Sequence, residues 1–315
     1  MKLQAYGNCK SDVRGSAMRS CDVKTFGDAV GIVLLEKGQV SWDIDATTGE
    51  IDFTELSWTE KLQSLQAFPY ARIYEFEQNT PENEKATSSN GTMSKIRDGK
   101  PYFTFIFDKG SCFHKSLYDK SGKDRWDLGI IFDTGILLVT DSAETKLRGF
   151  DMGMMSVETY KFLQGTDPEQ STAMIQLLDA NEFNQYHTFI TWEQAGFNVL
   201  DYAGVHDAAL TLQAVPGATN TEVNVFVSGV CNSDDAILGL DDPTMWSLGG
   251  TQAAATTISV VAYDAVGGFY VLTLDVALAA GDTIKPQLGS GGEVVATDAA
   301  GNMFKGSVKS VVTIA

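Results

Sequence analysis

The sequence predicts a mainly β protein of two domains: an N-terminal β-sandwich or barrel-like domain with one flanking helix, followed by a second β-sandwich. Three observations lead to this prediction. Short segments of alternating β-forming residues recur between glycine and aspartate turns. A single segment has clear helical spacing. The length of 315 residues exceeds what one ordinary core accommodates.

Residues 93–117 carry the strongest strand pattern and predict a three-stranded meander. β-Forming residues alternate there between two turns, Asp98-Gly99 and the turn at 108–110. Because side chains alternate along a strand, the middle strand has two largely apolar faces. One is Phe103, Phe105 and Phe107, and the opposite one is Tyr102, Thr104 and Ile106. We expect one face to pack on its own domain and the other on a second layer or another subunit.

The residues before this meander predict strands and then the one helix. Residues 22–42 form strands with a hairpin turn at 37–38. Residues 53–67 change to helical spacing, with Thr54 or Ser57 as the cap, and Pro69 ends the helix. Residues 71–76 return to an extended pattern.

Residues 77–90 form a long polar segment with several acids and no large apolar side chain. Long loops inside compact domains are uncommon and are either functional or mobile. Two interpretations remain open. The segment is a disordered solvent loop, or it is an arm that becomes ordered only against a neighbouring subunit.

The rest of the first domain predicts further strands. A hairpin spans 126–139 and turns at 133–135. Shorter extended pieces follow at 147–150, 156–163, 172–178 and 186–192. We place the domain boundary so that the domains are 1–205 and 206–315.

The second domain contains three lysines, no arginine and many small or β-branched residues. Alternating strands are predicted at 209–215, 222–230, 256–263, 269–277, 282–288 and 307–314. The turn at 264–268 joins two of them as a hairpin. The inner face of this hairpin would carry Tyr270, Leu272, Leu274 and Val276.

The formal net charge of -18 and the pI near 4.4 argue against a nucleic-acid-binding groove, because phosphate contacts need an excess of Lys and Arg. Such acidity is typical of a soluble protein that repels its own copies. It also suits the wall of a conduit through which DNA passes without sticking. The N-terminus lacks the apolar stretch of a signal peptide and the longest apolar runs are strand-sized, so we expect no membrane span.

The cysteines predict no metal site. Cys9, Cys21, Cys112 and Cys231 are scattered and contain no CxxC pair. This spacing favours free thiols in a reducing compartment.

Four patterns resemble chemical sites only superficially. Residues 131–135 match the Asp-Thr-Gly core of aspartic proteases, but the chain has no second copy and a hairpin turn explains them. His114 lies two residues from Cys112, a spacing more typical of packing residues than of a nucleophile and its base. Acids at 232–235 and 241–242 lack the spacing of a calcium loop, and the glycines at 289–292 lack the lysine of a phosphate loop. We therefore predict no catalytic, cofactor or metal site and no enzyme.

The C-terminal stretch resembles the immunoglobulin-like domains appended to tailed-phage virion proteins. The resemblance rests on 261–264, 270–274 and 280–284. No bridge of the antibody type is expected, because Cys231 has no partner within the domain.

The first two hundred residues are similar in outline to phage tail tube proteins, in which sheets of six subunits join into a ring and rings stack into an acidic channel. The resemblance implies that helix 53–67 flanks the ring and that the meander lines the lumen. It also implies that 77–90 reaches the next ring.

The expected function is therefore a virion structural protein, most similar to a tail tube subunit. The implied partners are copies of itself in stacked hexameric rings and other tail proteins, with DNA as passing cargo, no membrane, and assembly in the host cytoplasm. The expected assembly residues are Tyr102, Phe103, Phe105, Ile106, Phe107, Pro81, Glu82 and Glu84. The alternatives are a capsid decoration or auxiliary head protein, and a glycan-binding adhesin with Trp246 or Tyr270 in the sugar site.

Overall fold

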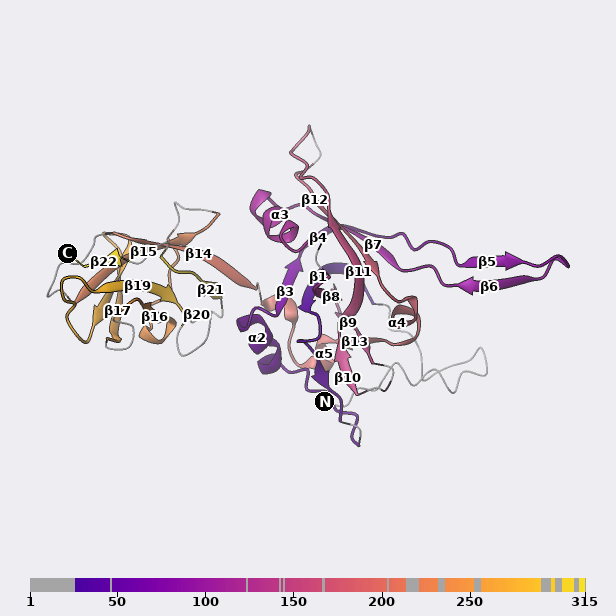
Figure 1. Cartoon of the computed structure of the whole chain (residues 1–315), viewed down its shortest axis with the longest axis horizontal. Coiled ribbons are helices and arrows are strands. Elements are labelled where there is room, and N and C mark those ends of the chain that lie inside the picture. Colours follow the sequence, from indigo (N-terminus) through magenta and orange to yellow (C-terminus); the bar gives the residue numbers. More distant parts are fainter. Residues whose placement is uncertain are drawn as a thin grey trace. The chain divides into compact units, whose positions relative to one another are not determined.

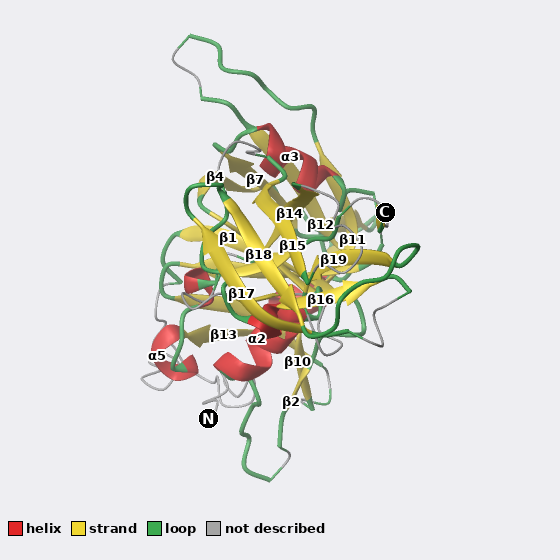
Figure 2. Ribbon diagram, turned by 90° about the vertical axis from the view of Figure 1, so that its left-hand side faces the viewer, coloured by secondary structure: helices red, strands yellow, loops and turns green. Residues whose placement is uncertain are grey.

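The protein is mainly β, as predicted, and its few helices are short (Figures 1 and 2). The computed structural model describes residues 26–45, 47–122, 124–141, 143, 145–165, 168–202, 204–213, 221–231, 236–251, 256–289, 296–297, 302–308 and 312–314. The chain passes from one compact unit to a second between Asp201 and Tyr202.

Eleven strands of the first unit belong to one sheet. They are β1 (Ala29–Glu36), β2 (Trp42–Asp43), β3 (Ala67–Ala71), β4 (Ile73–Gln78), β7 (Tyr102–Phe107), β8 (Trp126–Phe132), β9 (Gly135–Thr140), β10 (Lys146–Arg148), β11 (Phe150–Val157), β12 (Ser171–Leu177) and β13 (His187–Thr191). Two further strands, β5 (Glu84–Thr87) and β6 (Met93–Arg97), form a separate hairpin.

The large sheet closes into a barrel-like body because two of its segments, β11 and the continuous segment β3–β4, each bend and pair with a different strand before and after the bend. β11 pairs with β8 through Phe150 and Asp151 and with β12 from Met152 onward. On the other side, β3 pairs with β1 and continues through Arg72 into β4, which pairs with β7. Arg72 has a φ of 67°, a left-handed conformation that redirects the chain. The cycle β1, β8, β11, β12, β7, β4 thus returns through β3 to β1.

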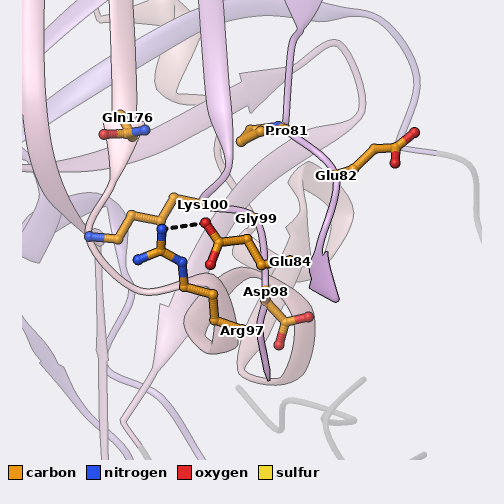
Figure 3. Close-up of a pocket in the computed structure, with 8 residues that line it drawn as sticks. All are labelled: Pro81, Glu82, Glu84, Arg97, Asp98, Gly99, Lys100 and Gln176. Atoms are coloured by element: carbon orange, nitrogen blue, oxygen red, sulfur yellow. Dashed lines mark hydrogen bonds and ion pairs between the residues drawn. The ribbon is translucent and has the colours of Figure 1, made fainter. Parts of the chain in front are cut away.

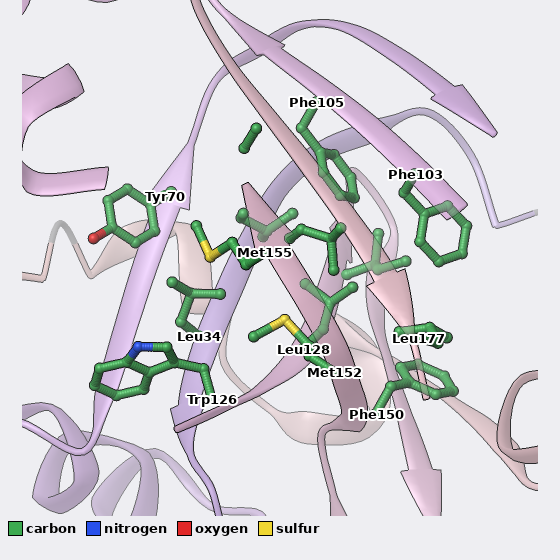
Figure 4. Close-up of a cluster of buried hydrophobic side chains, with 14 of the residues drawn as sticks. Leu34, Tyr70, Phe103, Phe105, Trp126, Leu128, Phe150, Met152, Met155 and Leu177 are labelled. Carbon is green, nitrogen blue, oxygen red and sulfur yellow. The ribbon is translucent and has the colours of Figure 1, made fainter. Parts of the chain in front are cut away.

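Aromatic, aliphatic and methionine side chains fill this body (Figure 4). Phe103, Phe105 and Phe107 of β7 are at most 1% exposed. Phe150 and Met152 of β11 lie in the same cluster. Full burial of one such side chain contributes roughly 1.5–3 kcal/mol. The expectation that one face of the central strand packs on its own domain is confirmed.

The predicted helix is present as α2 (Glu55–Gln63), and the two predicted caps act together. Thr54 N donates to Ser57 Oγ at 3.0 Å, and Ser57 N donates to Thr54 Oγ1 at 3.2 Å. Trp58 and Leu62, one turn apart, are fully buried. Pro69 does not terminate this helix but lies within β3. None of the helices among the described residues is long and apolar enough to cross a membrane.

The three-stranded meander predicted for 93–117 is wrong at both ends. Only its middle strand, β7, is in place, between β4 and β12. The first strand, β6, pairs instead with β5. The third segment is helix α3 (Ser111–Tyr118), which turns Phe113 and Leu117 towards the core. A spacing of four residues fits one face of either a strand or a helix, so the pattern alone did not separate the two.

Two other short helices of the first unit were also not predicted. They are α4 (Ala180–Gln185) and α5 (Trp192–Ala195). Each begins at a side-chain cap: Asp179 accepts from Asn181 N at 2.8 Å, and Thr191 Oγ1 accepts from Gln194 N at 3.3 Å. Polar caps of this type are common helix starts.

The second unit is a β-sandwich of a six-stranded and a three-stranded sheet. The first contains β14 (Val205–Leu212), β15 (Glu222–Gly229), β17 (Ile258–Asp264), β18 (Phe269–Leu274), β20 (Ala296–Thr297) and β21 (Met303–Lys305). The second contains β16 (Trp246–Gly249), β19 (Thr283–Leu288) and β22 (Val312–Thr313). Tyr270, Leu272 and Leu274 are buried in the shared core, as predicted. Val276 is exposed, because β18 ends before it.

The expectation of free thiols is wrong for the two cysteines that the structure describes. Cys112, in α3, and Cys231, two residues after β15, are both disulfide-bonded. Disulfides depend on the distance between cysteines in space, which scattered positions in the sequence do not reveal.

Candidate assembly surface

A two-stranded arm, residues 79–101, projects from the first unit (Figure 1). Its strands β5 and β6 pair antiparallel, with Lys85 opposite Lys95 and Thr87 opposite Met93. All residues of both strands are exposed, and Met93 and Ile96 are 69% and 64% exposed. The polar segment 77–90 is therefore not a structureless loop. An isolated two-stranded hairpin is marginally stable in water, so the arm is a candidate for contact with another molecule.

The base of the arm encloses a polar hollow of about 430 Å³ (Figure 3). Glu84 and Arg97 form an ion pair across it, with Oε1 and Nη2 2.5 Å apart. A Cβ atom on Gly99 would lie 1.8 Å from Pro81 O, so the two chain segments at the base of the arm approach too closely there for any side chain at position 99. Three of the residues that line the hollow, Pro81, Glu82 and Glu84, are predicted assembly residues. The other lining residues are Arg97, Asp98, Gly99, Lys100 and Gln176.

The predicted aromatic assembly residues fall into two groups. Phe103, Phe105 and Phe107 lie inside their own core, so they do not present a surface to a partner. Tyr102 and Ile106, on the opposite face of β7, are only partly buried. This second face is the part of the central strand that remains open to contact.

One edge of the large sheet is also open. β4 pairs with β7, and no described strand pairs with its other edge from Tyr74 to Gln78. Tyr74, Glu75 and Glu77 on β4 are exposed. Unpaired backbone groups along such an edge are a template for pairing with another chain.

A cluster of charged side chains lies where β11 crosses between its two partners. Asp127 of β8 is 2% exposed, lies opposite Asp151 and has an Oδ1 atom without a hydrogen-bond partner. Burial raises the pKa of Asp127 to about 7, and Arg148 opposes this shift. Lys37 Nζ pairs with Asp151 Oδ1 at 2.6 Å, and Arg148 pairs with Glu182. The one sequence signal for this cluster is an acid inside the apolar strand WDLGIIF.

The patterns that resembled catalytic sites have structural roles. Asp133 lies in the exposed turn between β8 and β9, where its backbone N donates to Asp28 O at 3.0 Å and its O accepts from Trp192 Nε1 at 2.9 Å. Cys112 and His114 are on α3, where side chains two residues apart point in different directions.

The aromatic residues expected in a sugar site are buried in the second unit. Trp246 Nε1 donates to Leu240 O at 2.8 Å, and Tyr270 OH donates to Ile237 O at 2.9 Å. Neither ring is accessible to a glycan.

The acidic and glycine-rich segments of the second unit show no ligand site in the described part. Asp242 caps a single 3-10 turn, η3 (Pro243–Met245), by accepting from Thr244 N at 2.8 Å. Residues 232–235 and 290–292 lie outside the described residues. Among the described residues, no group of three or more His, Cys, Asp or Glu side chains is arranged to hold a metal ion.

Sequence comparison gives no relative: no protein-family model matches the chain, and no curated protein matches it. The surface features from which a function can be inferred are the arm, the open edge of β4 and the half-buried face of β7.

Proposed function

We propose that this chain is a structural subunit of a tailed-phage virion that assembles with copies of itself into stacked rings, as tail tube subunits do. The observation that carries the proposal is the arm. Among the described residues no third strand lies beside its two strands, and Met93 and Ile96 are exposed on it. A neighbouring copy would supply the contacts that a two-stranded hairpin needs.

Two further surfaces suit lateral contact within a ring. The open edge of β4 would pair with a strand of the adjacent copy. This pairing would satisfy the backbone groups that otherwise make an unpaired edge prone to aggregation. The half-buried face of β7, with Tyr102 and Ile106, would be covered in the same contact. Closed rings of identical subunits use one such interface repeatedly.

The charge of the chain suits a conduit for DNA. A net charge of -18 repels phosphates, so DNA would pass through such a channel as cargo without binding. The other partners would be further tail proteins, and the location would be the virion, assembled in the host cytoplasm. The second unit would be an appended domain of the particle.

Electron microscopy of the negatively stained full chain, with sedimentation velocity over a range of concentrations, tests this proposal. Rings and stacked tubes are the expected result. A chain that stays monomeric at the highest attainable concentration would refute it. Binding to a capsid lattice without formation of tubes would instead favour a decoration or auxiliary head protein.

A further inference from the structure

The large sheet is joined between β8 and β11 by two residue pairs, here called the seam. Phe150 lies opposite Leu128, and Asp151 lies opposite Asp127. From Met152 onward β11 pairs with β12 instead, which leads to β7, β4 and the arm. On its other side β8 pairs with β1 along nearly its whole length. Regions held by few contacts open locally more readily than the rest of a fold, so closure of the body here depends on what stabilises the seam.

One of the two pairs of the seam places two carboxyl groups opposite each other. Asp127 is 2% exposed, and its Oδ1 atom has no hydrogen-bond partner among the described residues. Like charges directly opposite each other across two strands are destabilising. A buried charge without its own partner costs still more. Both penalties disappear when Asp127 carries a proton.

The charged groups around Asp127 include more acids than bases. They come from four elements and two turns: Asp127 of β8, Asp151 of β11, Glu182 of α4, Arg148 of β10, and Lys37 and Asp124 in the turns. Lys37 Nζ pairs with Asp151 Oδ1 at 2.6 Å, and Arg148 pairs with Glu182. Both bases are therefore engaged with acids other than Asp127. Burial raises the pKa of Asp127 to about 7, so a proton can compensate this carboxyl group near neutral pH.

We propose that Asp127 is a proton-dependent latch on the seam between β8 and β11. With the carboxyl group protonated the seam is closed, and when the proton leaves to solvent the two strands separate locally. The strands that carry the arm would then remain joined to β1 through β3 and the left-handed Arg72. The latch thus sets how firmly the arm-bearing strands are held to β8. The inference does not depend on the proposed function, because it concerns a single chain.

Hydrogen exchange of the full chain, followed by mass spectrometry of a peptide that contains residues 149–152, tests the latch. Because the pKa of Asp127 is about 7 in the closed seam and near 3.8 in the open one, acid favours closure. Protection, corrected for the intrinsic exchange rate, should fall by up to about tenfold per pH unit between about pH 4.5 and 6.5. In Asp127→Asn it should be independent of pH over this range. Asp133→Asn, which changes an exposed carboxyl group, is the control and should follow the wild type.

A comparison within the same chain separates local opening from global unfolding. The seam peptide should be less protected than a peptide from β12. Low urea concentrations should accelerate exchange in β12 more than in the seam, since a local opening exposes little surface. If the seam exchanges only together with β12, the latch is refuted.

Asp151→Asn provides a second variant in case Asp127→Asn does not fold, which circular dichroism would show. Its pH-dependent loss of protection should be smaller than that of the wild type, because Asp151 helps to raise the pKa of Asp127. An unchanged loss in Asp151→Asn, or the same pH dependence in Asp127→Asn and the wild type, refutes the inference. Neither result bears on ring assembly, which electron microscopy decides separately.

Discussion

Replacing Asp127 with asparagine is expected to stabilise the first unit above neutral pH. The carboxyl group is 2% exposed, and burial raises its pKa from 3.8 to about 7. Asp151 and Glu182 support this shift, whereas Arg148 and Lys37 oppose it. Because the pKa is higher in the folded chain, the protonated group contributes stability fully below pH 3.8. This contribution is lost as the pH rises through about 7.

The size of the effect follows from the two pKa values. The interval between 3.8 and about 7 corresponds to at most about 4.5 kcal/mol, at about 1.4 kcal/mol for each tenfold change in proton affinity. Asparagine has nearly the same shape and carries no charge at any pH. Its amide still needs hydrogen-bond partners, which offsets part of the gain.

Urea unfolding followed by tryptophan fluorescence measures this difference between about pH 4 and pH 8. The second unit is the same in both proteins, so subtracting their free energies of unfolding isolates the contribution of Asp127. The wild type should lose stability relative to Asp127→Asn as the pH rises. Asp133→Asn, which alters an exposed carboxyl group in the turn after β8, is the control and should follow the wild type. Parallel pH profiles for the wild type and Asp127→Asn would show that the buried carboxyl group is not the titrating group.

Three other outcomes are expected. Phe105→Ala should lower the free energy of unfolding by about 3–5 kcal/mol, because Phe105 is fully buried. Ile106→Ala should lower it by clearly less, because Ile106 is only partly buried. Equal losses for the two variants would contradict the assignment of the two faces of β7. Gly149→Ala should cost about 1–3 kcal/mol, because the new Cβ would lie 2.7 Å from Asp127 Cβ, and an unchanged urea midpoint would contradict this close approach. Replacing residues 84–97 with a short glycine-serine turn should change the free energy of unfolding of the first unit by no more than about 0.5 kcal/mol. The same change should abolish assembly, measured by sedimentation velocity. If tubes still formed, the arm would have no part in assembly.

Much of the strand content could be predicted from the sequence, because the alternation of side chains is a local property. The hairpin of β8 and β9 turns at 133–135, as the Asp-Thr-Gly sequence predicted, and Ile131 lies opposite Ile136. The inner face of β18 is also as predicted from Tyr270 to Leu274. Helix α2 could be predicted because its spacing and its cap at Thr54 agree.

The pairing of strands could not be predicted in the same way. The turn at Asp98-Gly99 indicated that β6 would pair with β7, yet β6 pairs with β5 and Gly99 packs against Pro81 at the base of the arm. A turn residue indicates the local conformation of the backbone, but it does not indicate which strand from elsewhere in the chain pairs beside it. The charged cluster around Asp127 was missed for this reason, since Asp127, Asp151 and Lys37 come from different segments of the chain.

The sequence by itself determined that this chain is rich in strands, that β7 has two distinct faces, and that the chain is strongly acidic. Only the tertiary structure decided that the face with Phe105 is internal, that Trp246 is buried, and that Asp127 lies opposite Asp151. The physical reason is that alternation defines the two faces of a strand locally. What covers each face depends on residues far away in the chain, which meet only when the sheet closes.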